Sequence, residues 1–316
     1  MYDVVIIGGG PAAAGAAVYV ARKKLKSVLI AKEFGGQSAV SASIENWIGD
    51  ELLTGFDLTQ KLERHIRAQK GLEVVSGELA NKISEIAGGF LVETDGGKSF
   101  ETKTIILASG SRRRRLGVPG EAKFEGKGVV FCATCDAPLF PEKKVAVVGG
   151  GNAGLEAVVD LTPYASKIYL LVRSDSLKGD PVTQDEVRAN SKVEIIYDAL
   201  TQEVLGADFV RGLKYKDAKT GEEKELAVEG VFVEIGAVPN SDIAKGLVEM
   251  NPFGEVLIDH KTGTTSKLGI YAAGDVTDEI YKQNNISVGD AVKAALSAYN
   301  YILGMQRRSP AAEVEK

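Results

Sequence analysis

The two cysteines of the chain lie in the segment FCATCD, where two residues separate Cys132 from Cys135 and Asp136 follows at once. A C-x-x-C spacing brings two sulfurs within bonding reach across one turn, as a redox disulfide requires. A zinc site needs three or four protein ligands, and the two histidines of the sequence, His65 and His260, are distant. The spacing alone favours a redox pair over two alternatives, inert buried thiols and a zinc ion shared between two chains.

Length and composition bound the kind of protein. The 316 residues are enough for two domains, and the 44% hydrophobic and 26% charged residues are typical of soluble globular proteins. The net charge of −5 disfavours a nucleic-acid-binding protein, which would be basic. Apolar runs reach about ten residues, too few to cross a bilayer, and MYDVVIIGGG resembles no secretory signal. We expect a cytoplasmic protein without nucleic-acid or membrane partners, in a compartment where disulfides are more often catalytic than structural.

Two segments of similar pattern indicate the folds that position the cysteine pair. YDVVIIGGGPAAAG opens the chain, and KVAVVGGGNAGLEA repeats the pattern with its first motif glycine at Gly149, against Gly8 in the first copy. Each is a buried β-branched run, then glycines, then a small-residue helical stretch. This is how a parallel strand turns into a helix that carries a phosphate on its N-terminus. Two copies in this context predict two dinucleotide-binding folds, with a purely structural glycine turn as the alternative for each.

The first copy has Gly8, Gly10 and Ala13 at the three positions of the fingerprint. Two glycines permit a tight turn and close approach of a pyrophosphate, and a small third residue permits helix–strand packing. An acid about twenty residues further on binds a ribose hydroxyl in such folds. Glu33 lies at that distance and is the predicted ribose ligand.

The second copy has Gly149, Gly151 and Gly154, the full glycine pattern. At the position of the ribose-binding acid stands Ser174, which follows Arg173. Neither a clear acid for NADH nor a dense basic cluster for the 2′-phosphate of NADPH is present. The motif therefore predicts a nicotinamide nucleotide and leaves the choice between NADPH and NADH open.

The order of the segments indicates how the two folds are connected. IILASG and IYAAGD both have the pattern of late strands of a dinucleotide fold, yet they flank the second copy on either side. The simplest topology is an α/β protein with two Rossmann-like domains, the second inserted into the first. We expect the outer domain to comprise residues 1–114 and 245–316 and the inner domain residues 115–244.

With these motifs assembled, the sequence resembles the low-molecular-weight thioredoxin reductase family. The resemblance covers nearly the whole chain and is carried, in order, by GGGPAAAG, GGQ at 35–37, IENW at 44–47, ILASGS, CATCD, GGGNAG, GAVPN at 236–240 and AAGDVTD…YKQ. The inner domain is also similar to the flavoprotein component of alkyl hydroperoxide reductase, whose N-terminal thioredoxin-like extension we expect this chain to lack. In this context CATCD implies a flavin-coupled redox disulfide.

The resemblance also implies the cofactors and the residues that hold them. The outer domain would bind FAD and the inner domain NADPH or NADH. The implied FAD ligands are Gly8, Gly10, Pro11, Ala12, Ala13, Glu33, Gly36, Gln37, Asn46, Ala108, Gly110, Gly274, Asp275, Lys282 and Gln283. The implied nicotinamide ligands are Gly149, Gly151, Asn152, Ala153, Gly154, Arg173, Ser174 and Lys178.

The chain departs from the family pattern at a few positions. The basic signature that follows the second strand in the family reads VRSDSLK here, so Arg173 and Lys178 keep positive charge whereas Val172 does not. No acid replaces Val172, and we therefore favour NADPH over NADH. Asp290 stands where the family has a second glycine near the flavin. The four arginines at 112–115 indicate either a solvated face or a docking site for an acidic protein.

The function implied by the resemblance is an electron relay. NAD(P)H would reduce FAD, FAD would reduce Cys132–Cys135, and the dithiol would reduce a thioredoxin or glutaredoxin-like protein. Cys132 would attack the partner, Asp136 would act as general acid, and Cys135 would face the flavin near the start of a following helix. The family is a homodimer whose inner domain swings. The alternatives are ferredoxin as electron donor, disfavoured by the intact second glycine motif, and a non-catalytic flavin- or nucleotide-binding regulator, disfavoured by CATCD.

Overall fold

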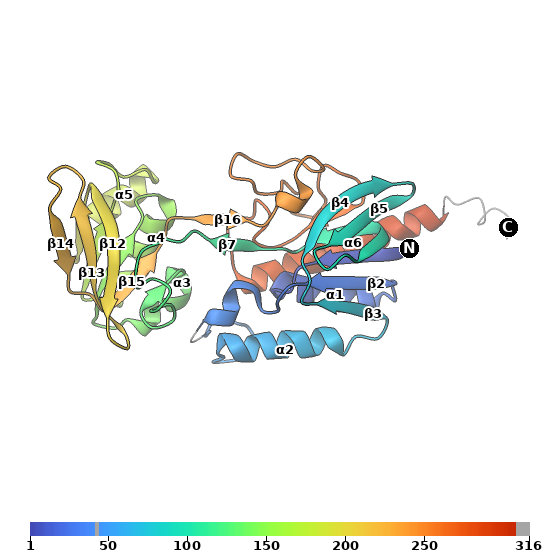
Figure 1. The fold of residues 1–316 in the computed structure, drawn as a ribbon, viewed down its shortest axis with the longest axis horizontal. Coiled ribbons are helices and arrows are strands. Elements are labelled where there is room, and N and C mark those ends of the chain that lie inside the picture. The colour runs from blue at the N-terminus through green and yellow to red at the C-terminus, as the bar shows by residue number, and fades with distance from the viewer. Residues whose placement is uncertain (42–43, 308–316) are drawn as a thin grey trace. The chain divides into compact units, whose positions relative to one another are not determined.

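The computed structural model describes residues 1–41 and 44–307. The chain divides into two compact units (Figure 1). The first unit consists of residues 1–112 and the segment that begins at Val238, and the second consists of residues 113–237. The chain therefore leaves the first unit once and returns to it once. The predicted extent of the outer domain to residue 316 runs past the described residues.

The first unit is built on a mixed sheet in which β1 is flanked by β2 and β6, with β3 at one edge. The β-branched run that precedes the first glycines becomes β1, which pairs with a parallel strand on each side and is buried because other segments cover both faces of the sheet. Strand β6 is long enough to pair with antiparallel β5 over its first half and with parallel β17 over its second half. The strands are β1 (Tyr2–Ile7), β2 (Ser27–Ala31), β3 (Leu72–Ser76), β4 (Ala80–Ile86), β5 (Gly89–Thr94), β6 (Ser99–Leu107) and β17 (Ile270–Ala272).

Helices cover one face of this sheet and pack through small residues. The helices are α1 (Pro11–Arg22), α2 (Gly55–Arg67) and α6 (Asn284–Arg307), with the 3₁₀ helix η1 (Gly36–Val40) beside α2. The 3₁₀ helix η3 (Asp242–Ala244) packs on the opposite face. Buried alanines of α1 meet buried alanines of α6, such as Ala291 and Ala294. A Cβ at Gly15 would lie 3.0 Å from the carbonyl oxygen of Val288. The small residues of the GGGPAAAG stretch thus let α1 approach α6 closely.

The second unit repeats this plan. Its parallel sheet has the order β11-β10-β9-β15-β8, and a three-stranded antiparallel sheet, β12-β13-β14, packs on the face opposite to the helices (Figure 1). The strands are β8 (Val129–Val130), β9 (Lys144–Val148), β10 (Lys167–Leu171), β11 (Val193–Ile196), β12 (Ala199–Gly206), β13 (Val210–Asp217), β14 (Glu223–Leu226) and β15 (Gly230–Val233). The helices are α3 (Ala133–Asp136), α4 (Asn152–Leu161), α5 (Pro181–Ala189) and the 3₁₀ helix η2 (Ala137–Leu139). The predicted fold class, two Rossmann-like domains in an α/β protein, is confirmed.

Both chain crossings lie in one two-stranded ribbon, formed by β7 (Ser111–Arg113) and β16 (Ala237–Pro239). The structure places the crossings at 112/113 and 237/238, whereas the sequence prediction placed them at 114/115 and 244/245. The second crossing comes earlier because β16 pairs with β7 as soon as β15 has ended. Ala244, which the prediction assigned to the inner domain, is buried in the core of the first unit. Within the described residues, no helix combines the length and apolar character needed to span a membrane.

Candidate redox and nucleotide-binding sites

The first glycine turn joins β1 to α1 and leaves room for a ligand. Gly8 has φ +133°, and a Cβ there would lie 2.1 Å from the carbonyl oxygen of Ala108, so the fold itself requires this glycine. Gly10, the N-cap of α1, has an ordinary φ of −84°. A Cβ on Gly10 would meet only the Cα of Gly36, at 3.9 Å. The fold does not require a glycine at position 10, and the space beside it, at a helix N-terminus, fits a pyrophosphate.

A polar cluster lies in the same unit. The Nε2 of Gln37 donates hydrogen bonds to Ser111 Oγ at 2.9 Å and to Asp275 Oδ2 at 3.3 Å, although Gln37 and Asp275 are 238 residues apart. Ser287 Oγ lies 3.4 Å from Asp275 Oδ1. The Oε1 atom of Gln37 is buried and has no hydrogen-bond partner among the described residues. An unpaired buried acceptor is unfavourable unless a ligand or a bound water supplies a donor, and the cluster therefore has room for a polar cofactor.

Gly274 brings Asp275 close to the first glycine turn. Its φ is +74°, and a Cβ there would lie 3.1 Å from the Cβ of Ala12 at the start of α1. Gln37 and Asp275 were predicted cofactor ligands, whereas Ser111 and Ser287 were not. Both serines are buried polar residues that follow or begin a regular element, a weak signal that sequence reasoning passed over.

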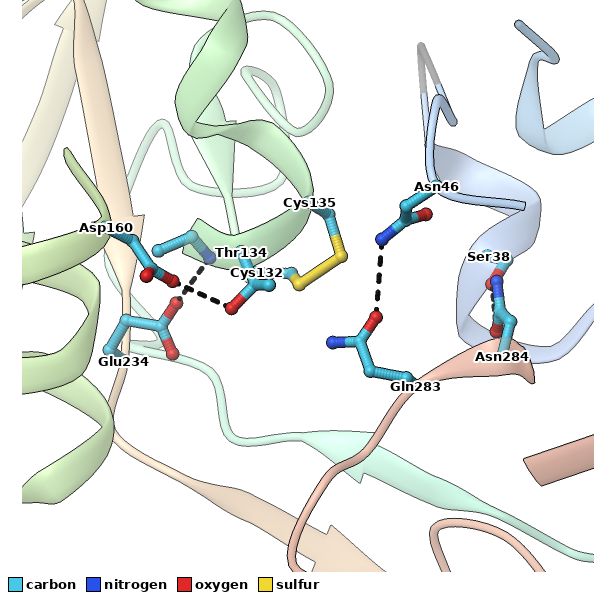
Figure 2. The surroundings of a disulfide bond; sticks show 10 residues. Ser38, Asn46, Cys132, Thr134, Cys135, Asp160, Glu234, Gln283 and Asn284 are labelled. Atoms are coloured by element: carbon cyan, nitrogen blue, oxygen red, sulfur yellow. Dashed lines mark hydrogen bonds between the residues drawn. A yellow bond between two sulfur atoms is a disulfide. The ribbon is translucent and has the colours of Figure 1, made fainter. Parts of the chain in front are cut away.

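Asn46, Lys282 and Gln283, three further predicted FAD ligands, make polar contacts within the protein. The Oε1 of Gln283 accepts a hydrogen bond from Asn46 Nδ2 at 3.3 Å, which ties the loop around residue 46 to the start of α6 (Figure 2). The ammonium group of Lys282 binds the carbonyl oxygen of Thr277 and Glu255 Oε1, the latter at 3.0 Å. The charge of Lys282 is thus already paired within the protein.

Glu33 is exposed two residues after the end of β2. Its role as the ribose ligand stays a prediction. Gly110 has φ +66° with open space at its Cβ position, and Ala13 is fully buried in the helix–strand contact. Asp290, the departure from the family pattern, pairs with Lys293 at 2.7 Å and keeps its second carboxylate oxygen buried without a hydrogen-bond partner among the described residues.

The second glycine turn joins β9 to α4. A Cβ on Gly149, whose φ is +142°, would lie 2.2 Å from the carbonyl oxygen of Glu234. A Cβ on Gly154 would lie 2.0 Å from the carbonyl oxygen of Gly149. Nothing lies within 4 Å of a Cβ built on Gly151. As in the first turn, the outer glycine is required by the fold, and the middle one leaves space that fits a phosphate.

The loop after β10 folds back over this turn. The backbone N–H of Lys178 donates to the carbonyl oxygen of Gly150 at 2.8 Å, and the N–H of Asp180 donates to Asn152 Oδ1 at 2.7 Å. Arg173 and Lys178 are exposed on this loop. Two positive charges therefore belong to the segment that is hydrogen-bonded to the turn.

Val172, Ser174 and Ala153 belong to the same loop and turn and differ in burial. Val172 is 2% exposed and packs on Gly150, so it serves the core and does not reach a ligand. Ser174 Oγ donates to the carbonyl oxygen of Ser176 at 2.8 Å, which uses its hydroxyl hydrogen. Ala153 is exposed in the first turn of α4.

The two cysteines form a disulfide in the short helix that follows β8. Cys132 has an extended backbone and caps α3, and its carbonyl oxygen accepts hydrogen bonds from the N–H groups of Cys135 at 3.2 Å and Asp136 at 3.0 Å. Both cysteines are half-buried. The sequence predicted Cys135 near the start of a helix that follows the motif. The helix instead begins at Ala133, because the Cys132 carbonyl already closes its first turn.

Glu234 and Asp160 lie beside the disulfide helix, and Asp136 is its last residue. Glu234 follows β15 directly, and its Oε1 accepts a hydrogen bond from the N–H of Ala133 at 3.1 Å (Figure 2). Burial raises the pKa of Glu234 to about 7, and burial raises the pKa of Asp136 to about 6; the positive charge of Arg113 opposes both shifts. Thr134 Oγ1 donates to Asp160 Oδ2 at 2.8 Å. Sequence reasoning missed Glu234, because an acid directly after the buried run GVFV looks like an ordinary strand end.

The arginine run is not one free basic face. Arg112 Nη1 donates to Asn240 Oδ1 at 3.0 Å. Arg115 forms a bidentate ion pair with Glu125 at 2.6 and 2.8 Å and stacks on Phe131. Arg115 is thus ion-paired within the chain, Arg112 is hydrogen-bonded to a neutral amide, and the charge of Arg113 acts on the carboxyl groups beside the disulfide. Among the described residues, no cluster of three cysteine, histidine or carboxylate side chains is placed to hold a metal ion.

Comparison with known proteins gives matches over most of the chain. The family model described as pyridine nucleotide-disulphide oxidoreductase matches residues 2–295. A Pseudomonas putida protein named as a component of alkyl hydroperoxide reductase is 44% identical over 305 residues, which cover 96% of this chain and 58% of that protein. A Bacillus subtilis protein named NADH dehydrogenase is 42% identical over 302 residues, which cover 96% of this chain and 59% of that protein. The chain thus spans about three fifths of the length of these relatives.

Solved structures give similar results. The thioredoxin reductase of Streptococcus pyogenes has a TM-score of 0.89 and 34% identity, and the match covers 96% of this chain and 99% of that one. The thioredoxin reductase of Giardia duodenalis has the same TM-score of 0.89 with 30% identity, over 96% of this chain and 99% of that one. The similarity extends through both units and through the segments that carry the glycine turns and the disulfide.

Proposed function

The chain belongs to the pyridine nucleotide-disulphide oxidoreductase family, and we propose that it passes electrons from NAD(P)H through FAD and Cys132–Cys135 to the disulfide of a thioredoxin-like protein. Members of the family use FAD and NAD(P)H. One observation carries the proposal. The disulfide helix follows β8, and the second glycine turn follows β9, which are both neighbours of β15 in one parallel sheet. The redox pair and the nucleotide turn therefore lie at the same edge of that sheet, where ligands bind in such folds.

The first unit would hold FAD, which when bound supplies a two-electron carrier between nicotinamide and disulfide. The open space at Gly10 and the unpaired Oε1 atom of Gln37 support this assignment. Asp275 and Glu33 would bind the ribityl and ribose hydroxyls. The other ligands implied by the resemblance stay predictions.

The second unit would hold the nicotinamide nucleotide. Gly151 leaves open space at the N-terminus of α4, and the loop hydrogen-bonded to this turn carries Arg173 and Lys178. Two positive charges beside a nucleotide favour the 2′-phosphate of NADPH over the hydroxyl of NADH. NADPH is therefore the proposed donor.

Cys132 and Cys135 would transfer the electrons by thiol–disulfide exchange. The Cys132 thiolate attacks one sulfur of the partner disulfide, a mixed disulfide forms, and the other partner sulfur leaves as a thiolate. Asp136, whose pKa is raised to about 6, would hold the proton that this leaving thiolate takes up. Cys135 then displaces the reduced partner, and the Cys132–Cys135 disulfide re-forms for the next reduction.

The acceptor has two candidates. Structures of thioredoxin reductases support a thioredoxin or glutaredoxin-like protein. The 44% identity to proteins named as components of alkyl hydroperoxide reductase supports electron supply to a peroxide-reducing partner instead. Homodimer formation and a cytoplasmic location are further proposals, and light scattering of the purified protein tests the first of them.

An anaerobic titration tests the donor side of the proposal. Purified, FAD-loaded protein is titrated with NADPH, NADH or reduced ferredoxin while the flavin absorbance is recorded. Bleaching by a nicotinamide nucleotide supports the proposal. Bleaching by ferredoxin alone would point to a ferredoxin-linked reductase, and no bleaching by any donor would point to a flavin- or nucleotide-binding regulator. Reduction of thioredoxin, glutaredoxin and a peroxide-reducing partner is then compared in turnover assays.

A further inference from the structure

Glu234 lies beside the redox pair because of the register between β8 and β15. Val129 is level with Val231 and Val130 with Phe232 in this parallel pair. Each strand ends within one residue of that point, and the same register continued puts Cys132 level with Glu234. The hydrogen bond from the Ala133 N–H to Glu234 Oε1, at 3.1 Å, spans the two chain segments, which are 101 residues apart.

The charges that face Glu234 come from three elements. Arg113, on β7, is the cation that stabilises its ionised form. Asp136, on α3, and Asp160, on α4, are carboxyl groups that destabilise it. Burial and these carboxyl groups raise the pKa of Glu234 to about 7, while Arg113 and the Ala133 N–H oppose the shift. The group therefore changes charge in the physiological pH range, within hydrogen-bond distance of the residue that follows Cys132.

We propose that Glu234 is a positioning residue that anchors the first turn of the disulfide helix and takes up a proton when the disulfide is reduced. The proposal rests on the redox role of Cys132–Cys135 in the proposed function. Reduction breaks the S–S bond with two electrons from a dithiol or reduced flavin, and two protons enter with them. One proton goes to Cys135 and the other to Glu234, which leaves Cys132 as a thiolate. Re-formation of the disulfide releases both protons.

The physical reason is repulsion between like charges. An ionised Glu234 and a Cys132 thiolate would occupy adjacent positions at the start of α3, beside two further carboxyl groups. Each anion raises the pKa of the other. Protonation of Glu234 removes this repulsion, and the neutral carboxyl group can still accept the Ala133 N–H. The pKa of Glu234 is therefore higher in the reduced protein than in the disulfide form.

Equilibration with a small dithiol tests the proposal without nicotinamide, flavin reduction or protein partner. Wild-type holoenzyme and Glu234→Gln are equilibrated with dithiothreitol between pH 6 and pH 8.5, thiols are trapped by alkylation, and the reduced fraction is counted by mass spectrometry. The pH dependence of dithiothreitol itself cancels, because both proteins share each buffer. Glutamine keeps the hydrogen-bond acceptor and removes the charge. Bound FAD and the thermal unfolding curve establish that each variant is folded.

The ratio of reduced to disulfide form should be nearly the same in the two proteins at pH 6, where Glu234 is mostly neutral in both redox states. At pH 8 and above, Glu234→Gln should have a ratio of reduced to disulfide form about three- to tenfold higher than wild type, as expected for the loss of one nearby like charge. The alkylation rate of Cys132 should also indicate a lower thiol pKa in the variant. A merely structural role would change neither pH profile.

Asp160→Asn is the matched control, because Asp160 is a carboxylate of the same cluster that binds a side-chain hydroxyl of α3 instead of its backbone. The ratio of reduced to disulfide form in Asp160→Asn should stay within about twofold of the wild-type ratio at every pH. The proposal is overturned if Glu234→Gln has the wild-type ratio of reduced to disulfide form at every pH. It is also overturned if Asp160→Asn raises this ratio at pH 8 as much as Glu234→Gln does. Failure of NAD(P)H to reduce a wild-type protein that shows the pH-dependent step would contradict the proposed function and leave the role of Glu234 standing.

Discussion

The two glycine turns share a backbone plan and differ in what surrounds them. In both, the first glycine has positive φ, and a Cβ there would clash with the carbonyl oxygen of the residue that follows a neighbouring strand. That residue is Ala108 in the first turn and Glu234 in the second. In both, the middle glycine, Gly10 or Gly151, faces open space. The first turn is accompanied by the polar cluster of Gln37 and Asp275, and the second by the loop that carries Arg173 and Lys178 and by the disulfide helix.

In the proposed function, the turns bind the phosphate groups, whereas their surroundings determine which ligand is bound. The turn provides space and N–H groups for a phosphate, which every dinucleotide offers. The identity of the ligand and its chemistry depend on segments that other parts of the chain bring to the strand ends. Variants that affect one turn and leave the other intact therefore test the assignment of each unit.

The largest effect is expected from the cysteines, which belong to the second unit alone. Cys132→Ser and Cys135→Ser should each reduce disulfide reductase activity to background while the protein keeps its FAD, because neither sulfur holds the cofactor. If Cys135 faces the flavin, Cys132→Ser leaves its thiolate free to donate charge and should show a broad long-wavelength absorbance that fades on acidification. Appearance of the band in Cys135→Ser instead would reverse the two roles.

A matched pair of valine substitutions compares the two turns directly. Gly10→Val and Gly151→Val have backbone angles that accept a side chain, with φ of −84° and −95°. Each should fill the phosphate space and weaken the binding of its own ligand by about 1–3 kcal/mol, or roughly five- to 150-fold. Gly10→Val should lose FAD, and Gly151→Val should keep FAD and bind the nicotinamide nucleotide weakly. Flavin content and nucleotide titration measure both, and full flavin content in Gly10→Val would refute the first assignment.

The choice of nucleotide tests the role of Arg173 on the loop over the second turn. Arg173→Ala should raise KM for NADPH roughly tenfold, as expected for the loss of a charge-assisted hydrogen bond, and should leave KM for NADH nearly unchanged. Steady-state kinetics with both donors provide the measurement, and Lys178→Ala on the same loop is the comparison variant. Equal effects on the two donors would mean that Arg173 does not contact the 2′-phosphate.

The third position of the fingerprint distinguishes the turns by packing. Gly154→Ala should destabilise the protein by about 1–3 kcal/mol, because its Cβ would lie 2.0 Å from the carbonyl oxygen of Gly149. Ala13→Gly in the first turn should cost about 1 kcal/mol, the usual penalty of glycine within a helix. Urea unfolding of both variants gives the comparison. A larger loss for Ala13→Gly would contradict the tighter packing of the second turn.

The smallest effect concerns the pH dependence of stability near the disulfide. The pKa of Asp136 is about 6 in the folded protein against 3.8 for an unperturbed group, because burial penalises its charge. The folded state therefore binds the proton more tightly, and the associated stability is present below pH 3.8 and lost as the pH rises through about 6. Asp136→Asn should be about 1 kcal/mol more stable than wild type at pH 8, after allowance for solvent screening, and should match it near pH 4. Denaturant unfolding at both pH values measures the difference.

Much of the fold could be predicted from the sequence, because its signals are local. The strand–glycine–helix pattern at Gly8 and Gly149 indicated two Rossmann-like domains, and their order indicated that one is inserted into the other. The C-x-x-C spacing indicated the redox pair. Each of these depends on sterics or reach within a few residues, such as the freedom of glycine at positive φ.

The tertiary structure decided what long-range pairing brings together. The hydrogen bond between Gln37 and Asp275 joins segments 238 residues apart, and the one between Ala133 and Glu234 joins segments 101 residues apart. Because β7 pairs with β16, the chain returns to the first unit at 237/238 and not at 244/245 as predicted from the sequence. No local pattern sets these contacts, because the register of parallel strands follows from the packing of the whole sheet. Glu234 therefore looked like an ordinary strand end in the sequence, and only the alignment of β15 with β8 placed its carboxylate on the first turn of the disulfide helix.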